Sequence, residues 1–335
     1  MGAGARGQEP GEGQRRRDKG NAGMDVNTKA NGRYAVLFRT HFWDDYAERQ
    51  YQRLLRVAGG GDVFILVDET SRPVPIPHPN VVPHTQQGVL DLGLAGAGHG
   101  NMLWFNGDYP LYYFYQQHGG YDHYVMIEYD VVVQRSLDDV MERVSREGID
   151  LVGLSNTEAP AVWPLAPTCR GVYSDDDLRK CLICISVFSN RAVRRLFDRR
   201  LEMSHQHEAG LMQRWPHCEA FIPTEVAAAG FKMAELSEFG PTSRYDWKPA
   251  IVETELPALA GQAFVHPLLD PRRYVPHIMG DLWPPEAFFD PRNAAGQRLR
   301  RAPFSLYGPP LARMLWRRAG APFRKLLPAG RQART

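Results

Sequence analysis

Short runs of uninterrupted apolar residues, separated by amphipathic segments, place the strongest constraint on the fold of this 335-residue chain. Two of the runs cover residues 34–38 and 63–67, and a third covers residues 124–133 with two carboxylates inside it. A strand that is covered by helices on both faces has this continuous pattern, whereas a strand with one solvated face alternates. The pattern therefore predicts buried strands with helices on both sides.

The segments between the apolar runs carry the start and stop signals of helices: acidic or hydroxyl residues and a first-turn proline at their starts, and glycine at their ends. We expect helices over residues 44–57, 110–118, 136–147, from 189 or 190 onward, and over 224–229, and further strands over 151–154 and 181–187. Strands and helices that alternate in this way predict an α/β fold with a mostly parallel central sheet flanked by helices.

The two ends of the chain differ in composition from this middle part. Residues 1–32 have almost no large apolar side chain, and such a segment buries too little surface to offset its ordering entropy, so we expect disorder there. Residues 291–335 contain ten Arg, one Lys and no acid, a charge of +11, which leaves −9 for the other residues because the whole chain carries +2. We expect one α/β domain over residues 33–290 and a basic tail over 291–335.

The basic tail has two interpretations. Residues 311–318 and 323–327 interleave apolar and cationic side chains, which is typical of a helix on an anionic membrane surface, and the alternative is a solvated tail. The sequence has no apolar run of roughly 20 residues, no secretory signal and only four cysteines. We therefore expect a reduced, cytoplasmic protein that reaches the inner face of the membrane only if the tail binds there. The acidic main body argues against nucleic acid as a partner.

Glu128 and Asp130 interrupt the third apolar run, one residue apart. In a continuous strand both carboxylates point to the same side, where two like charges require a cation or hydrogen-bond donors. Mg²⁺ and Mn²⁺ are bound by one or two carboxylates together with substrate phosphates, and they stabilise a departing diphosphate. The alternative is structural: Glu128 caps a helix or pairs with an arginine, and Asp130 begins a turn.

The sequence Asn106-Gly-Asp-Tyr-Pro110, a helix, and residues 121–131 together resemble the central part of GT-A-fold glycosyltransferases. Those enzymes transfer a sugar from a metal-bound nucleotide diphosphate and place a D-x-D-type motif at the end of a middle strand. The resemblance implies that Asp130 binds the metal and that Glu128 lies near the ribose or the donor sugar. Glu128 departs from the motif, in which the first acid is usually Asp.

Residues 215–224, followed by a short helix and Gly230, are similar to the acceptor-side segment of the same family. In inverting members of that family a carboxylate in this segment acts as general base toward the acceptor hydroxyl, and Glu219 is the residue that fits this implied role. Glu225 competes for this role, but an acid at a helix start is favoured by the helix dipole alone. In the alternative interpretation, Glu219 pairs with Arg214 or His217.

Four other residues complete the predicted site. The resemblance implies that His266, in the segment 264–270, is an additional metal ligand, although a histidine before proline is often structural. Arg39 follows the first strand and would bind the diphosphate through its guanidinium, and Asp68 ends the second strand and would bind the base or the ribose. Asp108 either contacts the donor or caps a turn.

The predicted function is that of a metal-dependent glycosyltransferase of polysaccharide biosynthesis, which uses Mn²⁺ or Mg²⁺, a nucleotide-sugar donor, and a glycan, lipid-linked or envelope acceptor. A catalytically inactive relative that binds a nucleotide or glycan, or assists assembly, is the alternative. A nucleotidyltransferase would need a Gly- and Lys/Arg-rich phosphate loop, which residues 39–43 do not provide. Cys181 and Cys184 have zinc-like spacing but would face opposite sides of a strand, and we expect two buried thiols.

Overall fold

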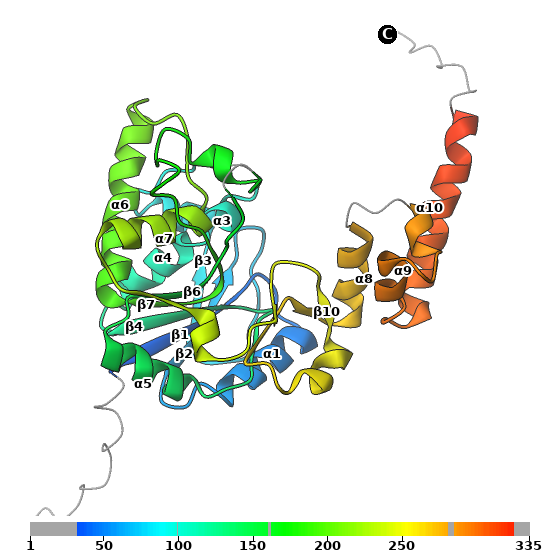
Figure 1. Ribbon diagram of the computed structural model, residues 1–335, viewed down its shortest axis with the longest axis horizontal. Helices are drawn as coiled ribbons and strands as arrows, with labels where there is room; N and C mark the ends of the chain where they lie inside the picture. The colour runs from blue at the N-terminus through cyan, green and yellow to red at the C-terminus, as the bar shows by residue number, and fades with distance from the viewer. Residues whose placement is uncertain (1–31, 99, 160–161, 281–284, 325–335) are drawn as a thin grey trace, which may run out of the picture.

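The computed structural model of the chain describes residues 32–98, 100–159, 162–280 and 285–324 (Figure 1). The prediction of disorder for residues 1–32 falls almost entirely outside this part, and the last residues of the basic tail, from 325, also lie outside it.

A seven-stranded sheet in the order β3-β2-β1-β4-β7-β6-β8 forms the centre of the molecule. Its strands are β1 (Tyr34–Thr40), β2 (Asp62–Asp68), β3 (Val81–His84), β4 (His123–Glu128), β6 (Leu151–Ser155), β7 (Cys181–Ser189) and β8 (Met233–Glu235). All adjacent pairs are parallel except those of β7, which runs antiparallel to β4 and β6. The predicted mostly parallel α/β architecture is confirmed. β3 lies in a proline-rich segment, and its position at the edge of the sheet explains how it accommodates Pro83.

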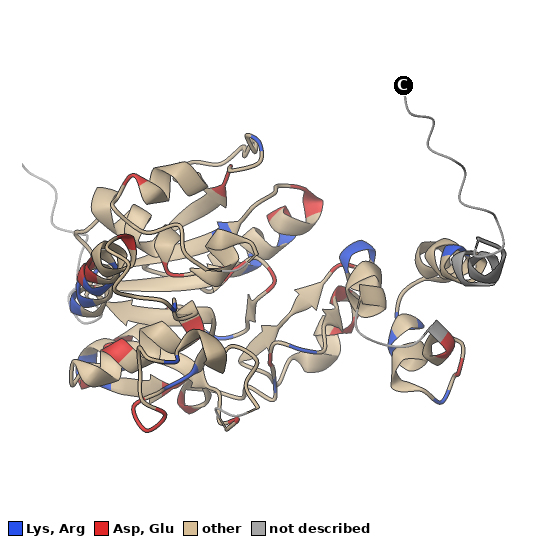
Figure 2. Cartoon of the chain, turned by 90° about the horizontal axis from the view of Figure 1, so that it is seen from above, with Lys and Arg blue, Asp and Glu red and all other residues tan. Residues whose placement is uncertain are grey.

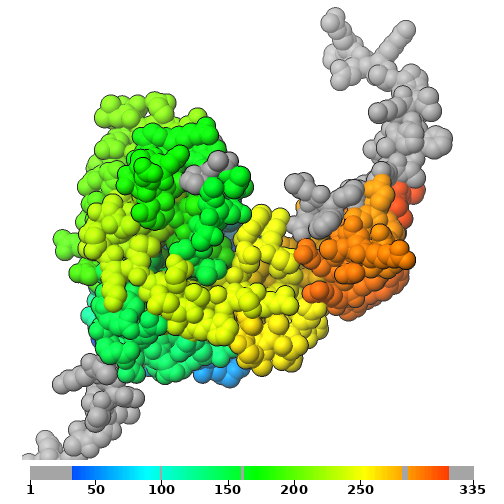
Figure 3. Space-filling view, viewed as in Figure 1, coloured from blue at the N-terminus to red at the C-terminus, as the bar shows by residue number. Residues whose placement is uncertain are grey.

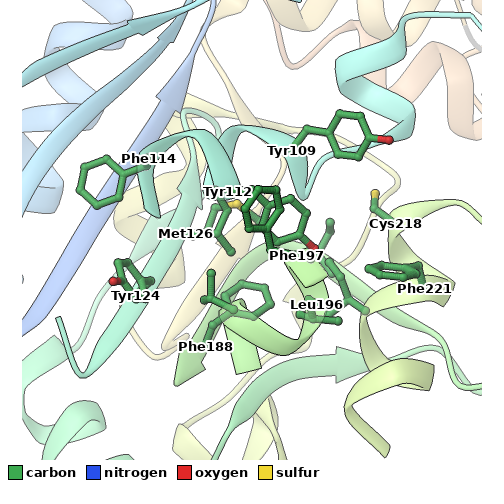
Figure 4. Packing of buried hydrophobic residues seen from close by; sticks show 14 of the residues in the cluster. Tyr109, Tyr112, Phe114, Tyr124, Met126, Phe188, Leu196, Phe197, Cys218 and Phe221 are labelled. Carbon is green, nitrogen blue, oxygen red and sulfur yellow. The ribbon is translucent and has the colours of Figure 1, made fainter. Parts of the chain in front are cut away.

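Helices cover both faces of this sheet, as the continuous apolar runs predict (Figure 1). They are α1 (Asp45–Leu55), α2 (Gln86–Leu90), α3 (Met102–Phe105), α4 (Tyr109–Gln117), α5 (Leu137–Glu147), α6 (Asn190–Glu208) and α7 (Cys218–Ala228), with 3₁₀ turns at Ala166–Thr168, Leu236–Phe239 and Glu253–Leu259. Residues from α1 and α5 pack on one face of the sheet, and residues from α4, α6 and α7 pack on the other. Figure 4 shows the apolar cluster on the face covered by α4, α6 and α7, in which aromatic rings fill the space between β4, β7 and the helices.

The helix ends follow local signals in the sequence. The Asp44 side chain accepts hydrogen bonds from the first-turn amides of α1, and Ser136 does the same for α5. Gly148 ends α5 in the left-handed conformation at φ +63°, and Ser189 caps α6. α7 is longer than predicted, because it begins at Cys218 rather than at residue 224. Glu219 therefore lies in its first turn.

The third apolar run is not one strand. β4 ends at Glu128, residues 129–130 form a turn, and β5 (Val132–Val133) joins a separate small sheet with β11 (Phe264–His266) and β9 (Arg244–Tyr245). The expectation that Glu128 and Asp130 lie on the same side of one strand is therefore wrong. A second small sheet pairs β10 (Ile251–Val252) with β12 (Leu268–Leu269). Pairing of β5 with β11 brings the end of β11 close to the turn after β4.

The predicted domain boundary at residue 290 does not separate two packing units. α8 (Pro271–Gly280), a 3₁₀ turn (Pro285–Phe288), α9 (Ala294–Leu299) and the start of α10 (Phe304–Arg324) share one apolar cluster with Val252 and Leu269. These helices form a lobe beside the main body (Figure 2, Figure 3). The first part of the basic tail is thus folded, because its apolar side chains pack against α8. Among the described helices, none combines the length and the apolar character needed to cross a membrane.

Candidate functional site

A cavity of about 290 Å³ lies at the carboxyl ends of β1, β2 and β4. We call it the strand-end cavity. The strands contribute Arg39, Asp68 and Glu128 to its wall, and the first turn of α7 contributes Glu219. Ligands of α/β proteins bind at this edge of the sheet. The fold therefore brings four of the predicted site residues to one cavity.

A second cavity of about 700 Å³ adjoins the first and shares His41, Asp68, Asn101 and Tyr129 with it. We call it the turn cavity, because Asp130 in the turn after β4 lines it. Other lining residues are the cationic pair Arg272 and Arg273. Both cavities are lined by carboxylates as well as arginines, which suits a ligand that carries phosphates and a hydrated metal.

Asp130 and His266 face each other across the gap between the turn and β11, with 3.7 Å between Oδ1 and Nε2. The His266 side chain is buried, at 7% exposure, and the Asp130 side chain is partly buried, at 14%. His266 Nδ1 lies 2.6 Å from the carbonyl oxygen of Asp246 and donates to it, so the lone pair of Nε2 points toward Asp130. Asp130 Oδ1 has no hydrogen-bond partner, and burial raises the pKa of this carboxyl to about 7.

An unpartnered carboxylate oxygen beside a neutral imidazole nitrogen is a suitable pair of ligands for a divalent cation. The backbone hydrogen bond of His266 fixes the tautomer that a metal ligand needs. Burial lowers the pKa of His266, which keeps the imidazole neutral. The residues present therefore fit Mn²⁺ or Mg²⁺, with the remaining positions left for water and phosphate oxygens.

Glu128 lies close to a second pair of potential ligands. The ligand atoms of Glu128, Cys184 and His266 all lie within 4.8 Å of one another. The sequence did not indicate Cys184 as a site residue. Its zinc-like spacing suggested only Cys181 as a partner, and not the distant Glu128 and His266. The two thiols do face opposite sides of β7, as expected: Cys181 packs in one apolar cluster and Cys184 in the other.

Glu128 also pairs with Arg39, with 3.5 Å between Oε1 and Nη1. The two residues are direct neighbours in the paired strands β4 and β1. Burial raises the pKa of Glu128, and the Arg39 charge opposes this effect. The structural alternative for Glu128, an ion pair with an arginine, is thus present in the molecule, and the same pair lines the strand-end cavity.

Glu219 is the carboxyl group that faces the strand-end cavity from the acceptor-side segment. Its backbone amide donates to Nδ1 of His217, the N-cap of α7, and within the described residues its carboxyl makes no ion pair or hydrogen bond. The alternative pairing with Arg214 or His217 is therefore absent there. Burial, with a contribution from the Glu128 charge, raises the pKa of Glu219 to about 8. Such a group can accept a proton near neutral pH.

The competing acid, Glu225, is occupied by partners on α6 and the preceding loop. Its Oε1 accepts from Arg199 at 3.1 Å and from the Tyr173 hydroxyl at 2.9 Å, and its Oε2 lies 3.6 Å from Arg195. The sequence predicts Glu225 at the start of a helix, but the residue lies in the last turn of α7. These contacts give Glu225 a structural role and leave Glu219 as the free acid.

The prediction that Asp108 contacts the donor is not supported by this geometry. Its side chain has no exposed surface, its Oδ2 accepts from Arg200 Nε at 2.7 Å, and the Tyr112 hydroxyl donates to the same oxygen at 3.0 Å. Asp108 is not among the residues that line the strand-end cavity, whereas its neighbour Gly107 is. The partner, Arg200, lies 92 residues away, which no local pattern indicates.

Two histidines that line the strand-end cavity, His84 and His217, are not among the site residues that the sequence predicts. Burial lowers the pKa of both His84 and His217 to about 4, so both rings are neutral. Nδ1 of His84 and Nε2 of His217 have no hydrogen-bond partner. Since His217 Nδ1 accepts from Glu219, its Nε2 carries the proton and is a donor available to a ligand oxygen.

No known protein-family profile matches the chain, and no curated protein sequence is similar to it. Solved structures are similar in fold, and those that follow are glycosyltransferases of the GT-A type. They include the bifunctional glycosyltransferase WbbM (14% identity, 74% of this chain and 49% of that chain, TM-score 0.41), mouse xyloside xylosyltransferase 1 (12%, 70% and 97%, 0.38) and an active-site mutant of LgtC (10%, 75% and 98%, 0.39). The chain spans about half the length of WbbM.

Proposed function

We propose that the protein is a metal-dependent glycosyltransferase, which moves a sugar from a nucleotide-diphosphate donor to a glycan, lipid-linked or envelope acceptor. The observation that carries this proposal is the convergence of three groups at one edge of the sheet. The Asp130–His266 pair lies at the turn cavity, which Asp130 lines, Arg39 lies at the end of β1, and Glu219 faces the strand-end cavity. Metal-dependent, inverting sugar transfer from a nucleotide diphosphate uses a cation site, phosphate contacts and a base close to one another.

Each group has a role in the proposed reaction. Asp130 and His266 would hold the cation, and the bound cation would supply positive charge to the leaving diphosphate. Arg39 and Arg272, which line the two cavities, would contact phosphate oxygens, and Asp68 would accept a hydrogen bond from the ribose or base. Glu219 would take the proton of the acceptor hydroxyl as that oxygen attacks the anomeric carbon.

A catalytically inactive protein that binds a nucleotide or glycan, or assists assembly, is the second candidate. One observation favours it: Glu128 already pairs with Arg39 and interacts with the Cys184 thiol, so both strand-end charges are engaged with each other. If this pair persists when a nucleotide binds, neither residue is available to the donor.

We propose further that α10 brings the protein to the inner face of an anionic membrane. The exposed side chains Phe304, Leu315 and Trp316 lie on this helix, and the sequence from residue 291 onward carries only positive charge. An amphipathic helix with both features binds anionic lipid surfaces. This location would suit a lipid-linked or envelope acceptor.

The test is a thermal-shift titration with UDP-, GDP-, dTDP- and CMP-sugars, with and without Mn²⁺, on the wild type, Asp130→Ala and the surface control Asp91→Ala. A ligand at a hundred times its Kd stabilises the native state by about 2.7 kcal/mol. A metal-dependent shift with one nucleotide, retained in the control and lost in Asp130→Ala, supports the transferase and names its donor. A shift that needs no metal favours the second candidate. If no nucleotide gives a shift, the result contradicts the transferase and also an inactive protein that binds a nucleotide.

A further inference from the structure

Trp104 forms a wall between the strand-end cavity and a third cavity of about 560 Å³. Its indole is 61% exposed, although most large apolar side chains of the main body are buried. We call the third space the Trp104 cavity. Phe105 and Trp215 also line it, so aromatic rings form much of its apolar surface.

Trp104 is exposed, but its position is fixed by its neighbours. It lies in α3, where the Asn101 side chain accepts from its backbone amide at 3.2 Å. Its ring lies 5.0 Å from the His217 ring, and its carbonyl oxygen lies 3.9 Å from the Cys218 thiol. Both contacts are to the start of α7, next to Glu219. The indole is therefore a fixed surface adjacent to the proposed base.

The polar groups of the Trp104 cavity are neutral or cationic. His207, Gln213 and Arg214 line it, and no carboxylate is among the lining residues. Arg214 is exposed, and within the described residues its guanidinium makes no ion pair. Trp215 is held from behind by a 2.7 Å hydrogen bond from its indole nitrogen to Asn106. The cavity thus combines rigid aromatic walls with an unpaired positive charge.

We propose that the Trp104 cavity binds a carbohydrate with an acidic group, and that this carbohydrate is the acceptor. A pyranose ring has an apolar C–H face that packs against an exposed indole, and a volume of several hundred Å³ accommodates a small ligand of this kind. Arg214 would bind the acidic group. Because Trp104 also lines the strand-end cavity, which contains Glu219, an acceptor that extends past the indole would reach this carboxyl. The acceptor role, unlike the binding itself, rests on the proposed glycosyltransferase function.

The binding experiment uses the full chain without nucleotide and four probes. Two probes are acidic, a hyaluronan tetrasaccharide and a tetragalacturonate, and two are neutral, chitotetraose and maltotetraose. Affinities are measured by isothermal titration calorimetry or ligand-observed NMR for the wild type, Trp104→Ala, Trp104→Phe and Arg214→Gln. The matched control is Trp247→Ala, because Trp247 is equally exposed at 60% and lines neither cavity.

We expect an acidic probe to bind more tightly than the neutral ones. Trp104→Ala should weaken its binding roughly five- to tenfold, the effect of losing one aromatic contact, while Trp104→Phe retains much of it and Trp247→Ala retains all. Arg214→Gln should remove the preference for acidic probes. Absence of binding by all four probes, or equal binding by wild type and Trp104→Ala, would overturn the proposal.

The nucleotide titration separates this proposal from the proposed function. Saccharide binding that depends on Trp104 in a protein that binds no nucleotide supports the carbohydrate site and contradicts the transferase. A metal-dependent nucleotide shift without Trp104-dependent saccharide binding supports the transferase and overturns the acceptor site. Since Trp104 is exposed, its variants should unfold at the temperature of the wild type, which circular dichroism checks.

Discussion

Arg200 and Asp108 form an ion pair in which neither side chain exposes any surface, with 2.7 Å between Nε and Oδ2. The Arg200 guanidinium also stacks on the Phe221 ring at 3.7 Å and donates to the Pro216 carbonyl. The pair thereby connects α6 to the start of α4 and to the segment that begins α7. It holds the first turn of α7, and therefore Glu219, against the sheet.

Substitution of Asp108 should destabilise the protein strongly. Asp108→Ala leaves the Arg200 charge buried without its partner, and breaking such a pair costs about 3–5 kcal/mol. Urea unfolding followed by circular dichroism measures the change. The control is Asp198→Ala, which removes the exposed pair of Asp198 with Arg194 and should cost under about 1 kcal/mol. Equal, small effects of the two substitutions would show that the buried pair contributes little to stability.

The rate of the proposed transfer should rise with pH through about 8. Glu219 has a raised pKa of about 8, and only its deprotonated form can act as a base. Because the Glu128 charge contributes to this shift, Glu128→Gln should move the rise in any residual rate to lower pH. The pH dependence of kcat/KM measures both effects. Glu225→Gln is the control, and a rise that moves equally in that variant would exclude Glu219 as its source.

The same carboxyl should make stability depend on pH. Its pKa is about 8 in the folded protein and 4.5 in the unfolded chain, so the folded state binds the proton more tightly. Its contribution to the free energy of unfolding is fully present below about pH 4.5 and is lost as the pH rises through about 8. Glu219→Gln, which cannot ionise, should therefore gain stability relative to wild type between these limits. Urea unfolding at pH 5, 7 and 9 tests this, and a constant difference would contradict the raised pKa.

Mn²⁺ should raise the unfolding temperature of the wild type, and EDTA should reverse the shift. Asp130→Asn and His266→Ala should each abolish it, because the two side chains supply the paired ligand atoms. Burial raises the pKa of Asp130 to about 7, so the apparent affinity for Mn²⁺ should increase as the pH rises toward 7. Differential scanning fluorimetry measures the shift. A shift of the same size in both variants would place the metal elsewhere.

The 335-residue chain should bind vesicles that contain anionic lipid and should not bind vesicles of neutral lipid alone. The attraction between basic residues and the surface weakens with salt, so binding should fall as NaCl increases. Trp316→Ser should reduce binding, because this 76% exposed side chain of α10 would enter the interface, whereas Trp247→Ser should not. Vesicle co-sedimentation is the measurement. Salt-independent binding, or equal binding by both variants, would exclude this role for α10.

The parts of the fold that the sequence predicts are those with local causes. Asp44, Ser136 and Gly148 mark helix ends because each acts on backbone groups within a few residues. The continuous runs of β1 and β2 predict buried strands because burial on both faces needs apolar side chains at every position. The antiparallel direction of β7 has no such local signal, because its composition is that of any buried strand.

The site is predictable only in part for the same reason. Asp130 and His266 are 136 residues apart in the chain, and the pairing of β5 with β11 brings them together. Their proposed roles came from a resemblance, whereas the proximity is a property of the tertiary structure. Cys184 enters the site because β7 lies beside β4, and Asp108 leaves it because a distant arginine buries it. Sequence patterns contain none of these long-range contacts.

The end of strand β4 at Glu128 has a mechanical consequence. Glu128 is the last residue of β4 in the seven-stranded sheet, whereas Asp130 leads into β5 of the three-stranded sheet. In the chain, β11 of that sheet is followed by β12 and α8. A cation held by Asp130 and His266 would bind the diphosphate, and the diphosphate would also contact residues of the seven-stranded sheet. The bound donor would therefore connect the two sheets. Binding of the donor would then stiffen the joint between the main body and the C-terminal lobe, and release of the nucleotide would loosen it.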